Sequence, residues 1–306
     1  MPKITYNSIK MKNKNLLIVI AFVAGSFSSF AQSNLLNAKK PAEIGVKSPG
    51  QLISDNDKPL AYGYVHDRDV LMGKTTWEII DLDERINFPL YYPIDTANIG
   101  KDRRSLYDVL IASIKAGKLT EVYTDSYFNT KKTMKDIQSS LSKIDTTDAG
   151  REQFNAGIPI DPQYIVKTDL GAIDVSQYKI KGYWYFDSRQ SELKYRLLGI
   201  CPVTPDVYTI GKEEQDYIEL FWIYYPAARD FLHAAKAFND KNSAMPIAFD
   251  QLFNSRHFNA VVYQEENVYG DRMINDYVKD NAQMELLESA RVKEKIRDFE
   301  HDMWAY

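Results

Sequence analysis

The chain is poor in the side chains that most often build disulfide frameworks and metal sites. It has 306 residues and one cysteine, Cys201, which excludes an intrachain disulfide framework and a cysteine-rich zinc module. Cys201 is expected as a small buried hydrophobe, and a thiol that pairs with a partner stays open. His233 and His257 lie in Ala- or Phe-rich stretches without spaced partners, which favours the edge of a core. We therefore expect no metal ion and no other cofactor.

Catalytic motifs are also missing. The sequence has no His-Glu-x-x-His, no Gly-x-Ser-x-Gly, no Walker loop and no Gly-x-Gly-x-x-Gly. The densest carboxylates lie in Asp81-Leu82-Asp83-Glu84-Arg85, which lacks the glycine turn and the third ligand of a calcium loop. As the polar end of a strand, this cluster is expected to be structural. The sequence therefore predicts a protein that is not an enzyme.

No apolar run of membrane-spanning length follows residue 31, and the shorter run before it is typical of an export signal. Several lysines precede the apolar stretch 16–25, which is too short for a spanning helix of about 20 residues. Small residues then lead up to Ala31. We expect a signal peptide over residues 1–31 that is cleaved between Ala31 and Gln32, and a membrane anchor is the alternative reading.

The mature chain is acidic, and it is the same whether translation begins at Met1 or Met11. Removal of residues 1–31 takes away four lysines and no acid, which leaves 34 basic and 42 acidic residues and a net charge of −8. Nucleic acids and anionic lipids attract basic surfaces, so neither is an expected partner. No cysteine lies at the cleavage site, so the protein itself is not expected to be a lipoprotein. The predicted product is a soluble exported protein.

The N-terminal part of the mature chain predicts an arm and a first folded unit. Residues 32–60 carry several prolines among polar residues without periodicity, which predicts an extended arm. Residues 61–128 predict a first α+β unit with strands at 77–82 and 119–123. Between these strands, a helix is expected from an N-cap at Ser105 to a stop at Gly117.

The remainder predicts a polar connection and a second unit. Residues 129–162 predict a surface helix over 134–144 followed by a linker. In the second unit, residues 163–306, apolar alternation predicts a hairpin whose strands include Tyr178–Phe186 and Leu193–Leu197. Its other expected elements are a buried strand at 217–225, a helix from Pro226 to 238, a helix at 247–258, a strand at 260–264 and a long helix at 272–304.

These elements predict an α+β fold of mixed strands and short helices in one or two compact units, ending in a long C-terminal helix. The sequence also contains a possible internal duplication. Tyr91-Tyr92-Pro93 reappears as Tyr224-Tyr225-Pro226, and a helix and a Val-Tyr pair follow each copy. Coincidence between two aromatic-rich units is the alternative.

One block combines a strand, a charge cluster and a rigid aromatic corner within a short stretch of chain. The corner, Phe88–Pro93, holds two prolines that exclude a central strand position. Tyr and Trp bring large contact area with few rotatable bonds, which is why interfaces favour them. If the block is exposed, it forms a compact recognition edge. The candidate interface residues are Trp77, Asp81, Asp83, Glu84, Arg85, Tyr91, Tyr92 and Pro93.

This block and three C-terminal segments resemble a known family. Residues 77–93 (WEIIDLDERINFPLYYP) are similar to the hallmark block of the gliding-motility family GldN and its PorN relatives. The segments DRMINDY at 271–277, LLESAR at 286–291 and FEHDMW at 299–304 agree with it. The resemblance covers nearly all of the mature chain.

The resemblance implies a periplasmic subunit of the type IX secretion system and gliding apparatus, without enzymatic activity. Such a subunit assembles with an outer-membrane lipoprotein, the K subunit, into a multimeric ring. It also contacts the periplasmic domain of the inner-membrane M subunit. The resemblance supplies no catalytic residue. On this reading, the arm at 32–60 is expected to lie on the lipoprotein.

A periplasmic glycan-binding or glycan-hydrolysing protein is the alternative function. Aromatic side chains would stack on sugars, and a carboxylate pair would come from Asp81, Asp83 and Glu84. The two carboxyl groups of a glycosidase flank one bond across a cleft, about 5–10 Å apart. Since neighbours in a strand alternate faces, only Asp81 and Asp83 share a side, and no partner opposite them is recognisable.

Overall fold

The computed structural model describes residues 58–96, 103–159, 161–209, 216–239, 246–279 and 281–304. By its internal contacts the chain divides into residues 1–56 and 57–306, and the fold described below belongs to the second part. The predicted signal peptide, its cleavage after Ala31 and the arm up to residue 57 lie outside the described residues.

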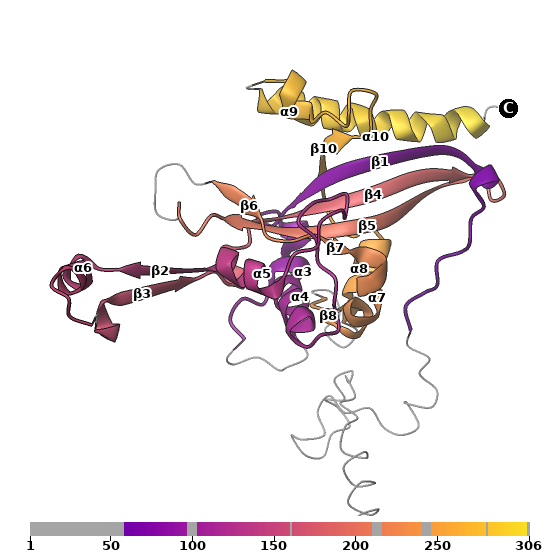
Figure 1. Ribbon diagram of the computed structural model, residues 1–306. Helices are drawn as coiled ribbons and strands as arrows, with labels where there is room; N and C mark the ends of the chain where they lie inside the picture. The colour runs from indigo at the N-terminus through magenta and orange to yellow at the C-terminus, as the bar shows by residue number, and fades with distance from the viewer. Residues whose placement is uncertain are drawn as a thin grey trace, which may run out of the picture. The chain divides into compact units, whose positions relative to one another are not determined.

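An antiparallel sheet forms the centre of the fold (Figure 1). Its strand order is β10-β1-β4-β5-β6, and β7 also pairs with β5. The bounds are β1 (Val70–Asp81), β4 (Gln177–Asp187), β5 (Glu192–Pro205), β6 (Tyr217–Glu219), β7 (Ile223–Tyr224) and β10 (Val261–Glu265). The α+β prediction is confirmed, and so are the predicted hairpin, now β4–β5, and the strands at 77–82 and 260–264.

The alternation predicted for β4 has a physical explanation at its one exception, Gly182. Tyr178 and Ile180 point from one face of the sheet into the main core. Gly182 follows on the same face, and its place is filled by the ring of Tyr195 from β5. A Cβ atom at Gly182 would lie only 2.2 Å from Cε2 of that ring, so the close approach requires glycine.

Helices cover this face of the sheet in two groups. The main core packs it against α3 (Phe88–Tyr91), α4 (Leu106–Lys115), α7 (Tyr225–Ala234) and α8 (Phe249–Asn254). A smaller core packs its β1 and β10 end against α9 (Ile274–Tyr277) and α10 (Ala282–Trp304). Ile180 in the first core and Trp184 beside the second point to the same side of β4, so both groups share one face.

A buried ion pair lies where the two helix groups meet. Nη2 of Arg256, just after α8, lies 2.7 Å from Oε2 of Glu78 in β1, and the Glu78 side chain is 1% exposed. The guanidinium also stacks on aromatic rings, with its carbon 4.1 Å from the ring centre of Tyr195 and 5.0 Å from that of Trp184. A carboxylate buried this deeply needs such a partner, so the pair fixes β1 relative to the end of α8.

Local helix signals were read correctly where they are strong. The hydroxyl of Ser105 accepts a hydrogen bond from the main-chain N–H of Asp108, which makes Ser105 the N-cap of α4. Gly117 adopts a φ of 68° after its end, as the predicted stop requires. The helix predicted from Pro226 is confirmed as α7, although it ends at Ala234 rather than near 238, and the helix predicted at 247–258 is limited to α8.

The predicted strand at 119–123 is wrong, and the strand at 217–225 is interrupted. Tyr123 and Trp222 exchange main-chain hydrogen bonds at 2.8 Å, which form an isolated bridge. Trp222 lies between β6 and β7, which pair with different parts of β5. Leu220 and Phe221, between them, are fully buried in the core.

The segment predicted as a helix and a linker contains more structure than expected. The helix is present as α5 (Met134–Leu141), shorter than predicted. In place of the linker, β2 (Ser142–Thr146) pairs with β3 (Ile165–Asp169), and α6 (Asp148–Asn155) lies between them. The predicted long C-terminal helix is present as α10, but residues 272–281 are separate from it and include α9.

The proposed duplication does not extend to the local structure. Tyr91 ends the short helix α3, whereas Pro226 lies in the first turn of the longer helix α7. The main core draws on residues from both predicted units, and the division at 129–162 stays a prediction. No helix in the described ranges is long and apolar enough to cross a membrane.

We expect Glu78→Gln to destabilise the fold by about 3 kcal/mol, because it leaves the Arg256 charge largely buried without a counter-charge. Urea unfolding of the purified chain measures the change. The double variant Glu78→Leu with Arg256→Met removes both charges and should recover much of the loss. Lys131→Ala breaks an exposed pair with Glu121 and serves as the control, with an unchanged midpoint. Equal effects of Glu78→Gln and Lys131→Ala would contradict this assignment.

Candidate interaction surface

The predicted interface block runs from the end of β1 through a turn into α3. Leu82 lies in the core, and the side chain of Asn87, fully buried, donates hydrogen bonds to the main-chain carbonyls of Asp81 at 2.6 Å and Asn259 at 3.1 Å. The Asn259 N–H in turn donates to the side-chain oxygen of Asn87. Asn87 thus holds the turn against the loop before β10, a role that its sequence position did not reveal.

Apart from the buried Leu82 and Asn87, the block presents a surface of mixed apolar and charged character. Asp83, Arg85 and Tyr92 are exposed, and Asp81, Glu84, Tyr91 and Pro93 are half-buried. The ring of Tyr92 packs edge-on against Tyr91 at 4.8 Å and Phe88 at 5.4 Å between ring centres. Tyr91 donates from its hydroxyl to the carbonyl of Ile173, and burial raises its pKa. Rigid aromatics beside charges are typical of protein interfaces. We call the surface formed by Asp83, Arg85, Ile86, Phe88 and Tyr92 the corner surface.

Trp77 does not belong to this surface. It is 1% exposed and packs with Cys201 and Trp222 on the other face of the sheet. The ammonium of Lys181 lies 4.8 Å from the centre of the Trp77 ring. Burial lowers the pKa of Lys181. Cys201 is fully buried, as a small hydrophobe would be, and burial raises its pKa.

The carboxylates of the block take part in the turn. The main-chain N–H of Asp83 donates to Oδ1 of Asp81 at 3.0 Å, and Glu84 accepts a hydrogen bond from the amide of Asn259 at 2.7 Å. In the described ranges, no group of three or more His, Cys, Asp or Glu side chains is placed to hold a metal ion. Nothing in this geometry assembles the cleft that a glycosidase needs.

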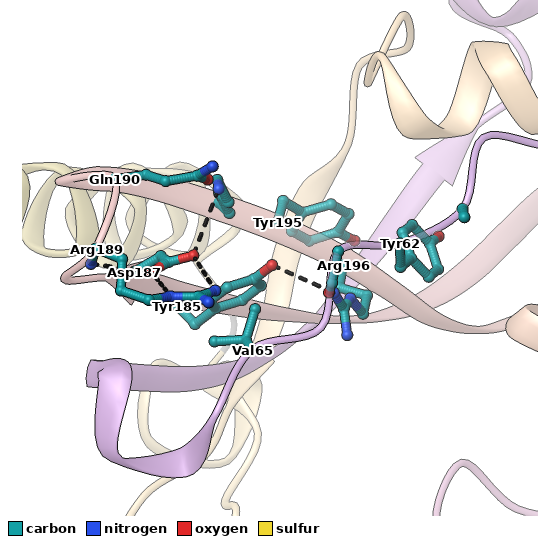
Figure 2. A pocket seen from close by; sticks show the side chains of 11 residues that line it. Tyr62, Val65, Tyr185, Asp187, Arg189, Gln190, Tyr195 and Arg196 are labelled. Atoms are coloured by element: carbon teal, nitrogen blue, oxygen red, sulfur yellow. Dashed lines mark hydrogen bonds and ion pairs between the residues drawn. The ribbon is translucent and has the colours of Figure 1, made fainter.

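A second feature, which the sequence reading missed, is an extended segment held by arginines. We call residues 58–66 the strap (Figure 2). Three guanidiniums donate to its carbonyls: Arg229 to Leu60 at 2.6 Å, Arg196 to Gly63 at 3.1 Å and Arg189 to Tyr64 at 3.0 Å. The strap is thus fixed by side chains of β5, α7 and the β4–β5 turn rather than by strand pairing.

Tyr62 anchors the strap through its side chain. Its ring centre lies 4.0 Å from the guanidinium carbon of Arg229 and 4.6 Å from that of Arg196, and its hydroxyl donates to Asn254. Burial raises the pKa of Tyr62. Arg229 is oriented by the buried carboxylate of Asp250, with Nε 2.8 Å from Oδ1. The anchor therefore continues into α7 and α8.

Between the strap and the β4–β5 turn lies a cavity of about 290 Å³ (Figure 2). Its walls carry Tyr185, Asp187, Arg189, Lys194 and Arg196. Asp187 is 1% exposed and binds Arg189, with Nη2 3.3 Å from Oδ2. This hydrogen bond is the main reason why the pKa of Asp187 lies below its ordinary value. The Asp187 carboxylate is thus already paired with positive charges of Arg189 and Lys194.

Two further surfaces expose apolar side chains. One lies around α9 and the start of α10, where Tyr269, Met284 and Leu287 are 73%, 48% and 63% exposed. The other is the β2–β3 hairpin, where Ile144 and Phe154 are 68% and 70% exposed. Met284 and Leu287 of α10 therefore face outward rather than into the core.

The described residues thus include exposed surfaces of mixed apolar and charged character and an extended segment that three arginines hold. A family model described as Gliding motility associated protein GldN matches residues 65–305, nearly all of the described part. The match includes the corner surface and all three C-terminal segments singled out in the sequence. No curated protein matches the chain.

Asp187→Asn should lower stability at neutral pH and have little effect at strongly acidic pH. Because the folded pKa of Asp187 lies below its ordinary value, its stabilisation is complete above about pH 4 and is lost as the pH falls through the folded pKa. Urea midpoints of both proteins at pH 7 and pH 3 measure this. Exposed Asp148→Asn is the control. A difference of equal size at both pH values would contradict the charge-based explanation.

Proposed function

This chain belongs to the GldN family of gliding motility associated proteins, and from that membership we propose that it is a structural subunit of the type IX secretion system. It acts in the periplasm without enzymatic activity. It assembles with an outer-membrane lipoprotein, the K subunit, into a multimeric ring, and it contacts the periplasmic domain of the inner-membrane M subunit. The observation that carries the proposal is the family match over residues 65–305.

The sequence before residue 65 supports an exported location. Residues 1–31 have the charge pattern, the apolar core and the small residues of an export signal, and no cysteine lies at the expected cleavage site. The protein would therefore reach the outer membrane through a partner rather than through its own lipid. The net charge of −8 on the mature chain is consistent with a protein partner and unfavourable for nucleic acid.

The arrangement of contact surfaces supports a subunit that binds more than one partner. The strap is held in place by Arg189, Arg196 and Arg229, so a chain segment that precedes it starts from a fixed point. We assign residues 32–57 to the lipoprotein, because an extended segment adds contact area at little cost in solubility. The corner surface then provides a second contact, in which Phe88 and Tyr92 supply rigid aromatic area.

A C-terminally tagged chain, extracted with mild detergent, should be recovered in large particles that contain an outer-membrane lipoprotein in near-equal amount. Mass spectrometry and negative-stain imaging measure this. A chain that keeps its export signal but lacks residues 32–57 retains the strap and should lose the lipoprotein. A monodisperse monomer from the full chain would contradict the proposed function. Full recovery of the particle with the shortened chain would contradict only the assignment of the arm.

Tyr92→Ala should weaken recovery of the particle without loss of fold, because the ring is exposed and belongs to the corner surface. The same extraction measures the effect, and circular dichroism of the purified chain verifies the fold. Tyr217→Ala, at a tyrosine of β6 that is 58% exposed and does not belong to the corner surface, is the matched control. Equal recovery from both variants would exclude the corner surface as a contact.

A further inference from the structure

Strand β2 has an edge that no other strand covers. In the part of the chain that the structure describes, β2 pairs with β3 alone. Two main-chain hydrogen bonds at the ends of β2 show which of its residues bond to β3. The Thr147 N–H donates to the carbonyl of Tyr164 at 2.9 Å, and the Leu170 N–H donates to the carbonyl of Leu141 at 2.8 Å. Since such bonds alternate along an antiparallel pair, the odd-numbered residues of β2 face β3.

The even-numbered residues of β2 therefore direct their main-chain groups to the open edge. The Thr146 N–H donates to Oδ1 of the neighbouring Asp145 at 2.9 Å. The Ser142 N–H donates to the carbonyl of Gln138 at the end of α5. At the centre lies Ile144, whose side chain is 68% exposed. An edge of this kind is a template for another strand.

The sequence of β2, Ser-Lys-Ile-Asp-Thr, is complementary to itself in the antiparallel direction. With a two-fold axis at Ile144, Lys143 of each copy lies opposite Asp145 of the other. Ile144 meets its own equivalent, and Ser142 meets Thr146. The two charges of each copy thus find opposite charges at both places.

The main-chain pattern agrees with this register. The Ile144 pair would be hydrogen-bonded, because the N–H and C=O of Ile144 point to the open edge. Each pairing of Lys143 with Asp145 would then fall on a non-hydrogen-bonded position, where facing side chains come closest. In the single chain, Nζ of Lys143 lies 3.2 Å from Oδ2 of Asp145, so both side chains already lie on the same face of β2.

From these observations we propose that β2 pairs with β2 of a second copy of this chain, in the order β3-β2-β2-β3. The resulting four-stranded antiparallel sheet is a more stable unit than the isolated two-stranded hairpin. The contact is isologous, so it joins two copies. It does not depend on the proposed function.

The other edge of the hairpin is the competing site and provides a matched control. Strand β3 has the same spacing in Lys167-Thr168-Asp169. If β3 paired with β3 of a second copy about an axis at Thr168, Lys167 and Asp169 would fall on hydrogen-bonded positions, where facing side chains lie further apart. No apolar side chain would then lie on the axis. Lys167 and Asp169 form an ion pair within β3 at 2.7 Å, as Lys143 and Asp145 do within β2, so the two edges differ in register and in the residue on the axis rather than in charge.

Sedimentation equilibrium of the purified mature chain over a range of concentrations tests the proposal. The wild type should dimerise. Lys143→Asp and Asp145→Lys each place like charges opposite one another and should weaken the dimer by about tenfold or more. The double variant with both substitutions restores complementarity and should restore dimerisation. Lys167→Asp should leave the dimer unchanged.

A cysteine at the axis gives a second readout. Cα atoms at a hydrogen-bonded pair lie about 5.5 Å apart, within disulfide range, so Ile144→Cys should cross-link on mild oxidation and Thr168→Cys should not. The native Cys201 is buried and should not interfere. A monomeric wild type without cross-linking of Ile144→Cys would overturn the proposal. So would a dimer that responds to Lys167→Asp, or one that ignores both single charge reversals.

Discussion

The ion pair between Glu78 and Arg256 is the interaction on which the rest of the fold depends. Glu78 lies in β1, the strand next to the edge strand β10, and Arg256 lies between α8 and β10. A carboxylate without water must keep its partner, so the pair holds the end of α8 against β1. Ser289 of α10, which accepts a hydrogen bond from the Val262 N–H, ties the second group to β10.

The parts of the fold that sequence predicts well are those fixed by neighbours in the chain. The cap at Ser105 and the stop at Gly117 act within a few residues, and the β4–β5 hairpin closes through a short turn. The strand 217–225 was misread because a distant residue, Tyr123, takes the main-chain groups of Trp222. Strands β2 and β3 were missed because they are short and polar, which gives little periodicity.

In the candidate site too, the sequence predicts local features better than contacts between distant residues. The sequence grouped Trp77 with the aromatic corner, although alternation along β1 sends that ring to the opposite face of the sheet. The hydrogen bonds from Arg189 and Arg196 to the strap join residues that are 125 and 133 positions apart in the sequence. No local sequence pattern predicts such contacts. Asn87 was missed for a similar reason, since its partner Asn259 comes from the far end of the chain.

The strap carries a consequence for how this region can change over evolution. Its three arginine contacts all end on carbonyl oxygens, which every amino acid possesses. Tyr62, in contrast, is held through its own side chain, which stacks on Arg229 and donates a hydrogen bond to Asn254. Selection can therefore act strongly on the arginines and on one tyrosine while the residues around that tyrosine drift. Relatives could keep this attachment with almost no recognisable sequence identity in the segment attached.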